Sequence, residues 1–122
     1  MSRPVGPYSP AVRAGAWVVT SGQLGVVPGD DGTPALVDGG TPAQVRRALA
    51  NLSAVLAAEG AGLADVAKAT VFLVDMGDFA EVNRAWTEAF GDHRPARSAV
   101  AVAALPLGAR VEVEAWAYRP PG

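Results

Sequence analysis

An arginine and a glutamate near the end of the chain are of the types that a small hydrolytic site needs. Arg97 opens a segment that is expected to be a strand, and two glutamates, Glu112 and Glu114, lie in the next expected strand. The planar guanidinium fork of arginine suits a carboxylate, which it can bind through two hydrogen bonds. A glutamate within one water molecule of a bound ligand can activate or position that water. Together the two side chains could hold a small acid and hydrolyse it.

The two strands must bring these side chains together. Residues 97–104 and 110–118 are separated by a short connection, so we expect an antiparallel hairpin. This pairing would place a carboxylate near Arg97, in the same subunit or in a neighbour. Strand alternation puts four side chains on one side of the second strand: Glu112, Glu114, Trp116 and Tyr118. The alternative interpretation is a half-exposed strand with two solvated carboxylates, which is the commoner case for an arbitrary strand.

Composition excludes several other chemistries. The chain has no cysteine, which excludes a disulfide scaffold, a thiol nucleophile and a thiolate metal site. His93 is the single histidine, which disfavours a metal centre with several histidines and a Ser-His-Asp triad. We expect His93 on an exposed loop. The net charge of −2 disfavours a partner whose many phosphates must be neutralised, so no nucleic acid is expected.

The periodicity of the apolar residues predicts one α+β domain over residues 1–122. The expected order is β-β-α-β-α-β-β, with both helices packed on one face of a mixed sheet. The first two strands would form a hairpin across Ala14-Gly15, and residues 25–40 would form a loop. The expected strands are 8–13, 16–21, 66–74, 97–104 and 110–118, and the expected helices lie between 41 and 60 and between 78 and 91.

Four residues mark the ends of the two helices. Thr41, with Gln44 three residues later, is typical of a capping box, and Asp78 with Glu81 repeats this pattern. The helices are expected to stop at two glycines, Gly60 and Gly91.

The sheet face without helices needs a second cover. Alternation over residues 97–104 leaves small or apolar side chains on both sides of the strand, and neither side suits bulk water. A homo-oligomer packed through its sheets is the simplest arrangement. No apolar stretch suits a signal peptide or a membrane helix, so we expect no membrane association and a cytoplasmic location.

Several separate blocks resemble the RidA (YjgF/YER057c/UK114) family, in the same order and over nearly the whole chain. The blocks are Gly6-Pro7-Tyr8-Ser9, Thr20-Ser21-Gly22-Gln23, Ala67-Lys68-Ala69-Thr70-Val71-Phe72, Asp78-Phe79-Ala80-Glu81-Val82-Asn83, Pro95-Ala96-Arg97-Ser98-Ala99-Val100, Leu105-Pro106 and Val111-Glu112-Val113-Glu114-Ala115. Any one block alone would be weak, but their agreement makes the resemblance specific.

The resemblance implies a chorismate-mutase-like subunit in a homotrimer with three clefts between neighbours. Archetypal members hydrolyse reactive 2-imino acids to 2-keto acids and ammonia, with no metal or cofactor. Arg97 matches the carboxylate-binding arginine of the family, and Glu112 matches the glutamate that engages the attacking water. Four positions match residues at the cleft: Tyr8 and Asn83 line it, whereas Gly22 and Ala99 meet the ligand through their backbone groups. Archetypal members commonly carry cysteine where this chain has Ala99.

The leading hypothesis is therefore a 2-iminobutanoate/2-iminopropanoate deaminase. One alternative is a non-catalytic trimeric binder or sensor of small carboxylates, for which Glu112 would be unnecessary. Another is an endoribonuclease, an activity that is also attached to the family name. The acidic charge balance and the lack of a histidine pair argue against it.

Overall fold

The computed structural model describes residues 6–122. Residues 1–5, part of the N-terminal segment in which we expected no signal peptide, lie outside the described range. The main sheet contains β1 (Ala11–Ala14), β2 (Trp17–Thr20), β3 (Gln23–Leu24), β6 (Val66–Leu73), β7 (Ala96–Ala101) and β8 (Val111–Tyr118). The helices are α1 (Gly40–Ala57) and α2 (Phe79–Phe90), and β4 (Val26–Pro28) pairs with β5 (Pro34–Leu36) in a small second sheet. Short 3-10 turns cover Leu63–Asp65, Met76–Asp78 and Pro106–Gly108.

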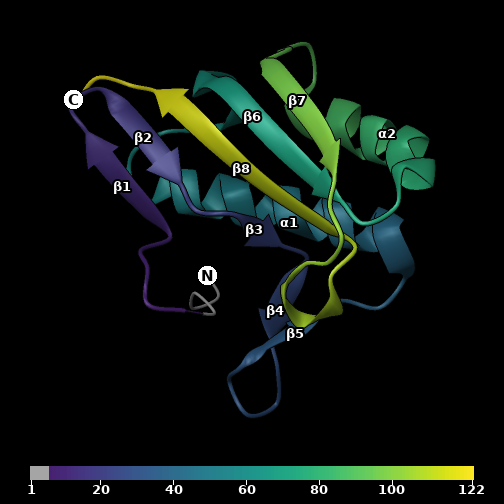
Figure 1. The fold of residues 1–122 in the computed structure, drawn as a ribbon. Coiled ribbons are helices and arrows are strands. Elements are labelled where there is room, and N and C mark those ends of the chain that lie inside the picture. Colours follow the sequence, from purple (N-terminus) through teal and green to yellow (C-terminus); the bar gives the residue numbers. More distant parts are fainter. Residues whose placement is uncertain (1–5) are drawn as a thin grey trace.

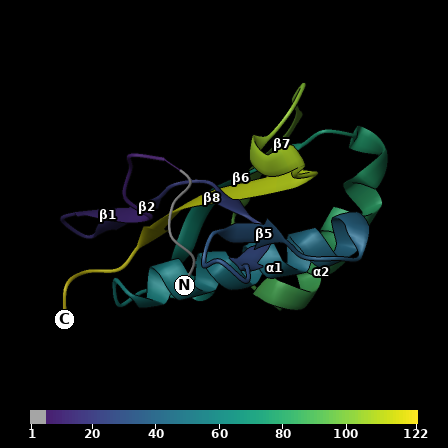
Figure 2. The same cartoon turned by 90° about the horizontal axis from the view of Figure 1, so that it is seen from below.

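The main sheet is mixed, as expected. Its strand order is β1-β2-β8-β6-β7, with β3 paired to β8 after β2 has ended (Figure 1). The β6–β7 pair is parallel, whereas the other pairs of this sheet are antiparallel. Both α-helices lie on one side of the sheet, and no α-helix of residues 6–122 lies on its other side (Figure 2). This arrangement confirms the predicted α+β class and the order of the main elements.

The core lies between the helices and the sheet. Every third or fourth residue of α1 is apolar, and Val45, Leu49 and Leu52 of this stripe are buried. The alternate residues Val111 and Val113 of β8 are fully buried beneath them. Because β8 pairs on both of its edges, its backbone determines where Glu112 and the other residues of the opposite side lie. Among the residues described, no helix is long and apolar enough to cross a membrane.

The expected hairpin between residues 97–104 and 110–118 is wrong. β7 pairs with β6 in parallel, and β6 separates β7 from β8. The helix α2 between β6 and β7 returns the chain to the same end of the sheet, which is how parallel neighbours are connected. β8 then pairs with the other edge of β6, where the alternate valines of β8 are buried. The strand beginning at Arg97 also ends at Ala101, earlier than expected.

Three local predictions also need correction. The first hairpin turns at Gly15-Ala16, because Ala14 pairs with Trp17, and Gly15 has a positive φ. The segment 25–40, expected to be a loop, contains the β4–β5 hairpin. Both helix caps differ from the expected capping boxes. Gly39 is the N-cap of α1, and Asp78 is the N-cap of α2 without a capping hydrogen bond from its side chain. The carboxylate of Asp78 and the hydroxyl of Thr41 instead bind each other.

The predicted helix ends agree with the structure. Gly60 has a φ of 77° after the last turn of α1, and the N–H of Ala61 donates to the carbonyl of Leu56. Gly91, with a φ of 63°, is the C-cap of α2. Both glycines adopt a left-handed backbone that favours residues without a Cβ.

Candidate functional site

Arg97 lies on β7, and its side chain points to the helix side of the sheet. Its Nη2 donates to the Oδ1 of Asn83 on α2 at 2.8 Å. Its guanidinium carbon lies 5.0 Å from the ring centre of Trp86 and 5.4 Å from that of Phe79. Partial burial lowers the pKa of Arg97 from its ordinary value. The guanidinium is therefore held in place by an amide and two aromatic rings, with donors left for a ligand.

A cavity of about 360 Å³ opens beside this arginine. It is lined by Asn83, Trp86, Thr87, Arg94, Pro95 and Arg97. Its volume falls within the range of small-molecule sites, about 300–1,000 Å³. No carboxylate belongs to the lining, and none pairs with Arg97 in the part of the chain that the structure describes. The cavity is thus a cationic pocket suited to a small anion.

Asn83 holds the guanidinium of Arg97, which is more specific than the cleft-lining position that the resemblance implies. Asparagine is a poor helix former, yet it lies in the interior of α2. Its side-chain oxygen fixes Arg97, and its backbone carbonyl accepts a hydrogen bond from the hydroxyl of Thr87 at 3.0 Å. The asparagine therefore orients the guanidinium.

The backbone of Ala99 faces the unpaired edge of β7. The N–H of Val102 donates to the carbonyl of Leu73 on β6 at 2.8 Å, and backbone groups alternate along a strand. The same alternation aims Val100 at β6 and turns the N–H and C=O of Ala99 away from it. No strand among the described residues pairs with that edge. A ligand at this edge could use both backbone groups, as unpaired strand edges commonly allow.

Glu112 lies on the opposite side of the sheet, on β8. Half-burial raises the pKa of its carboxyl above the ordinary value, and the charge of Glu114 adds to this rise. A carboxylate with a raised pKa holds protons more strongly, which favours proton transfer near neutral pH.

Gly22 leaves the space that this carboxylate occupies. A Cβ at Gly22 would lie 2.5 Å from the Cδ of Glu112, well inside a normal contact distance. Gly22 stands between β2 and β3, next to the position where β3 pairs with β8. Only a residue without a side chain permits this approach without moving Glu112.

Tyr8 lies in the segment that leads into β1, and this residue is 46% exposed. The segment is fastened beside Gly22 by two hydrogen bonds from Ser21. Its hydroxyl donates to the carbonyl of Ser9 at 2.6 Å, and its N–H donates to the carbonyl of Pro10 at 2.8 Å. Tyr8, Gly22 and Glu112 therefore belong to one region of the molecule.

The structure divides the predicted site residues into two groups. The arginine group is Arg97, Asn83 and Ala99, and the glutamate group is Glu112, Gly22 and Tyr8. Arg97 and Glu112 align with positions three residues apart on the intervening β6. At about 4.8 Å per strand and 3.3 Å per residue, their backbones are about 14 Å apart, with side chains on opposite faces. A single chain cannot apply both groups to one small ligand.

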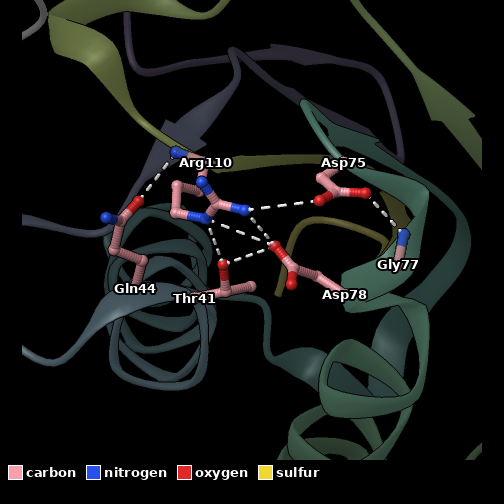
Figure 3. A network of polar contacts seen from close by, with 6 residues as sticks. All are labelled: Thr41, Gln44, Asp75, Gly77, Asp78 and Arg110. Carbon is pink, nitrogen blue, oxygen red and sulfur yellow. Dashed lines mark hydrogen bonds and ion pairs between the residues drawn. The ribbon is translucent and has the colours of Figure 1, made fainter.

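An ionic network that the sequence did not predict holds β8 in place (Figure 3). The N–H of Arg110 donates to Gln44 at 2.9 Å, and its guanidinium donates to Thr41 at 2.7 Å and to Asp78 at 2.8 Å. Hydrogen bonds from Thr41 and Arg110 lower the pKa of Asp78, and the hydrogen bond to Asp78, together with its charge, raises the pKa of Arg110. The network ties the first turns of both helices to the residue just before β8.

The face of the main sheet turned away from the helices, here called the open face, carries exposed aromatic side chains. The ring of Trp17 lies 6.4 Å from that of Trp116 and 5.1 Å from that of Tyr118, both edge-to-face. These three residues are 39%, 49% and 53% exposed, and Val12 nearby is 57% exposed. Such a cluster is typical of a surface that another protein covers.

His93 was expected on an exposed loop, but the structure shows it half-buried. Its Nε2 lies 2.7 Å from the carbonyl oxygen of Val66.

The fold and these two groups of residues define a small α+β domain with a cationic pocket on one side and a half-buried carboxylate on the other. A family model described as Endoribonuclease L-PSP matches residues 1–119. The chain therefore belongs to this family, which includes the RidA, YjgF and UK114 proteins.

Curated relatives and solved structures are similar over almost their full length. A 2-iminobutanoate/2-iminopropanoate deaminase of Bos taurus is 44% identical, over 96% of this chain and 83% of the relative. The RutC family protein PH0854 of Pyrococcus horikoshii is also 44% identical, over 96% and 90%. The structure of RidA from an Antarctic Psychrobacter has a TM-score of 0.88 and 42% identity, covering 96% of this chain and 92% of that one. Escherichia coli TdcF with bound serine has a TM-score of 0.85 and 38% identity, covering 97% and 92%.

Proposed function

We propose that this protein hydrolyses small 2-imino acids to 2-keto acids and ammonia, in clefts formed between copies of the chain. One observation carries the proposal: Arg97 is held in a cavity by Asn83 and two aromatic rings, and it lacks a carboxylate partner among the described residues. The carboxylate of a substrate would supply the missing anionic partner of the Arg97 guanidinium. Relatives named imine deaminases at 44% identity support this substrate class. TdcF with bound serine supports a site for a small amino-acid-like carboxylate.

The two residue groups would act on the substrate from two chains. Arg97 of one copy binds the carboxylate, and the N–H and C=O of Ala99 orient the imine nitrogen beside it. Glu112 of a neighbouring copy holds the attacking water. The exposed aromatic cluster on the open face, together with the separation of Arg97 from Glu112, supports an assembly through the sheets. The family resemblance supports a homotrimer.

The reaction needs one water molecule and one proton carrier. The water oxygen bonds to the imine carbon while Glu112 accepts a proton from it, and the C=N electron pair moves to the nitrogen. The protonated Glu112 returns the proton to that nitrogen. Glu112 then accepts the hydroxyl proton of the resulting carbinolamine and passes it to the amino nitrogen. The C–N bond breaks with its electron pair on that nitrogen, ammonia leaves, and a lone pair of the oxygen closes the C=O bond of the 2-keto acid. Positioning does most of the work, since a 2-imino acid is already electrophilic at this carbon.

An assay of imine lifetime tests the proposal. An amino-acid oxidase generates 2-iminobutanoate or 2-iminopropanoate, semicarbazide traps the imine, and the protein should reduce the amount trapped. Arg97→Ala should abolish this effect, because the carboxylate loses its charged partner. Glu112→Gln keeps the shape without the base and should slow turnover while 2-ketobutanoate still binds.

The alternatives give different results in the same experiment. A protein that binds 2-ketobutanoate through Arg97 but leaves imine decay unchanged is a carboxylate binder. RNA cleavage that persists in the Arg97→Ala variant, with no effect on imines, would support the endoribonuclease activity in the name of the family model. Full activity of Arg97→Ala on imines would refute the site assignment.

A further inference from the structure

We propose that the cavity beside Arg97 prefers imino or keto acids with a second anionic group, and that Arg94 provides this preference. The inference rests on the proposed function, because it names the substrate class of the same site. It goes beyond the monocarboxylic acids in the names of the imine deaminase relatives.

Two guanidinium groups line this one cavity. Arg94 and Arg97 lie on either side of Pro95 and Ala96, so an extended backbone separates their Cα atoms by at most about 10 Å. The rest of the lining is Asn83, Trp86, Thr87 and Pro95, which adds no negative charge. A carboxylate bound by Arg97 would therefore lie in a cavity whose other charged side chain is also cationic.

Hydrogen bonds within the protein hold one nitrogen of the Arg94 guanidinium and leave its other N–H donors available. Its Nη1 donates to the carbonyl of Gly91 and, at 3.1 Å, to that of His93, at the C-terminal end of α2. Within residues 6–122 neither its Nη2 nor its Nε has a hydrogen bond, and the side chain forms no ion pair. A guanidinium has five N–H donors in a fixed plane, so the outer edge remains for a ligand.

The length of the ligand follows from this spacing. Arg97 would bind the carboxylate next to the imine carbon, and Arg94, which lines the same cavity together with Trp86 and Thr87, would bind a group at the far end of the substrate side chain. A short aliphatic side chain would leave Arg94 in water, whereas a side chain ending in a carboxylate would neutralise it. The matching substrates are 2-imino or 2-keto acids of four or five carbons with a terminal carboxylate.

Binding of two stable keto acids separates these cases. Titration calorimetry at low ionic strength compares 2-ketobutanoate with 2-ketoglutarate on the unmodified protein and on Arg94→Gln. Arg84→Gln is the matched control, because it removes the same charge from the exposed side of α2, outside the cavity. We expect 2-ketoglutarate to bind about fivefold more tightly than 2-ketobutanoate, which is what an exposed ion pair supplies. The preference should disappear in Arg94→Gln, persist in Arg84→Gln and weaken with added salt.

Three results would overturn the inference: equal affinities on the unmodified protein, an unchanged preference in Arg94→Gln, or equal losses in the two variants. The readout does not depend on turnover. The protein could prefer dicarboxylates through Arg94 and yet have no effect on imines. This result would refute the proposed function and leave the role of Arg94 intact. Hydrolysis of 2-iminobutanoate without such a preference would refute only the role of Arg94.

Discussion

Replacing Gly22 by alanine should disable Glu112 without unfolding the protein. The added Cβ would lie 2.5 Å from the Cδ of Glu112, and ordinary contacts begin near 3.4 Å, so the carboxylate must retreat by nearly 1 Å. The obstacle is the end of a flexible side chain, and Gly22 does not have a positive φ, so the backbone accommodates alanine. A displacement of about 1 Å in a catalytic group can reduce turnover about 100-fold.

The imine-trapping assay measures this effect, with thermal unfolding as the check on folding. We expect a large drop in kcat for Gly22→Ala, unchanged affinity for 2-ketobutanoate and little change in Tm. Gly62→Ala is the control, because a Cβ there meets no atom within 4 Å and the φ of −141° suits any residue. Adding Gly22→Ala to Glu112→Ala should cause no further loss, because both changes act through one carboxylate. Full turnover by folded Gly22→Ala would refute the reasoning.

Three further predictions concern pH, the arginine pocket and assembly. Turnover should fall on acidification as Glu112 takes up its proton, at a pH above the ordinary pKa of a glutamate because burial raises the pKa of this carboxyl, and Glu112→Gln should lack this acidic limb in a pH–rate profile. Because the pKa of Glu112 is raised by folding, the folded state binds this proton more strongly than the unfolded state. The free energy of unfolding therefore falls as the pH rises through the raised pKa of Glu112. Glu112→Gln removes this loss and should raise Tm at pH 7. Asn83→Ala should raise KM about tenfold, because Arg97 loses a charge-assisted hydrogen bond, and steady-state kinetics on the imine measures it. Trp116→Glu should place a charge in the aromatic cluster and shift the mass in sedimentation toward a single chain, whereas an unchanged mass would exclude this face from the interface.

The sequence predicted the class of fold because local signals and burial agree. Apolar spacing located both helices, and alternation predicted that Glu112 and Arg97 each lie on a defined side of a strand. The strand order was not available from local signals. The short connection between residues 97–104 and 110–118 favoured a hairpin, yet β8 pairs with β6, and Val111, Val113 and Ala115 are fully buried there.

The polar network was missed for a similar reason. Thr41 and Asp78 are good N-cap residues, so each was assigned to its own helix. In the structure, the guanidinium of Arg110, which is distant from both in the sequence, donates hydrogen bonds to the side-chain oxygen atoms of Thr41 and Asp78. Residue type and strand alternation indicated Arg97 and the glutamates of the last strand, whereas Tyr8, Gly22, Asn83 and Ala99 came from the family resemblance. No local pattern indicated that these residues would divide into an arginine group and a glutamate group.

The placement of Arg97 and Glu112 on opposite faces has a genetic consequence. In the proposed trimer each cleft draws one essential residue from each of two copies, so a chain damaged in one group remains a useful donor of the other. Two inactive alleles, Arg97→Ala and Glu112→Gln, should therefore complement each other when expressed together. Random mixing in equal amounts would pair an intact arginine with an intact glutamate in about one quarter of the clefts. Mutations within one group should never complement.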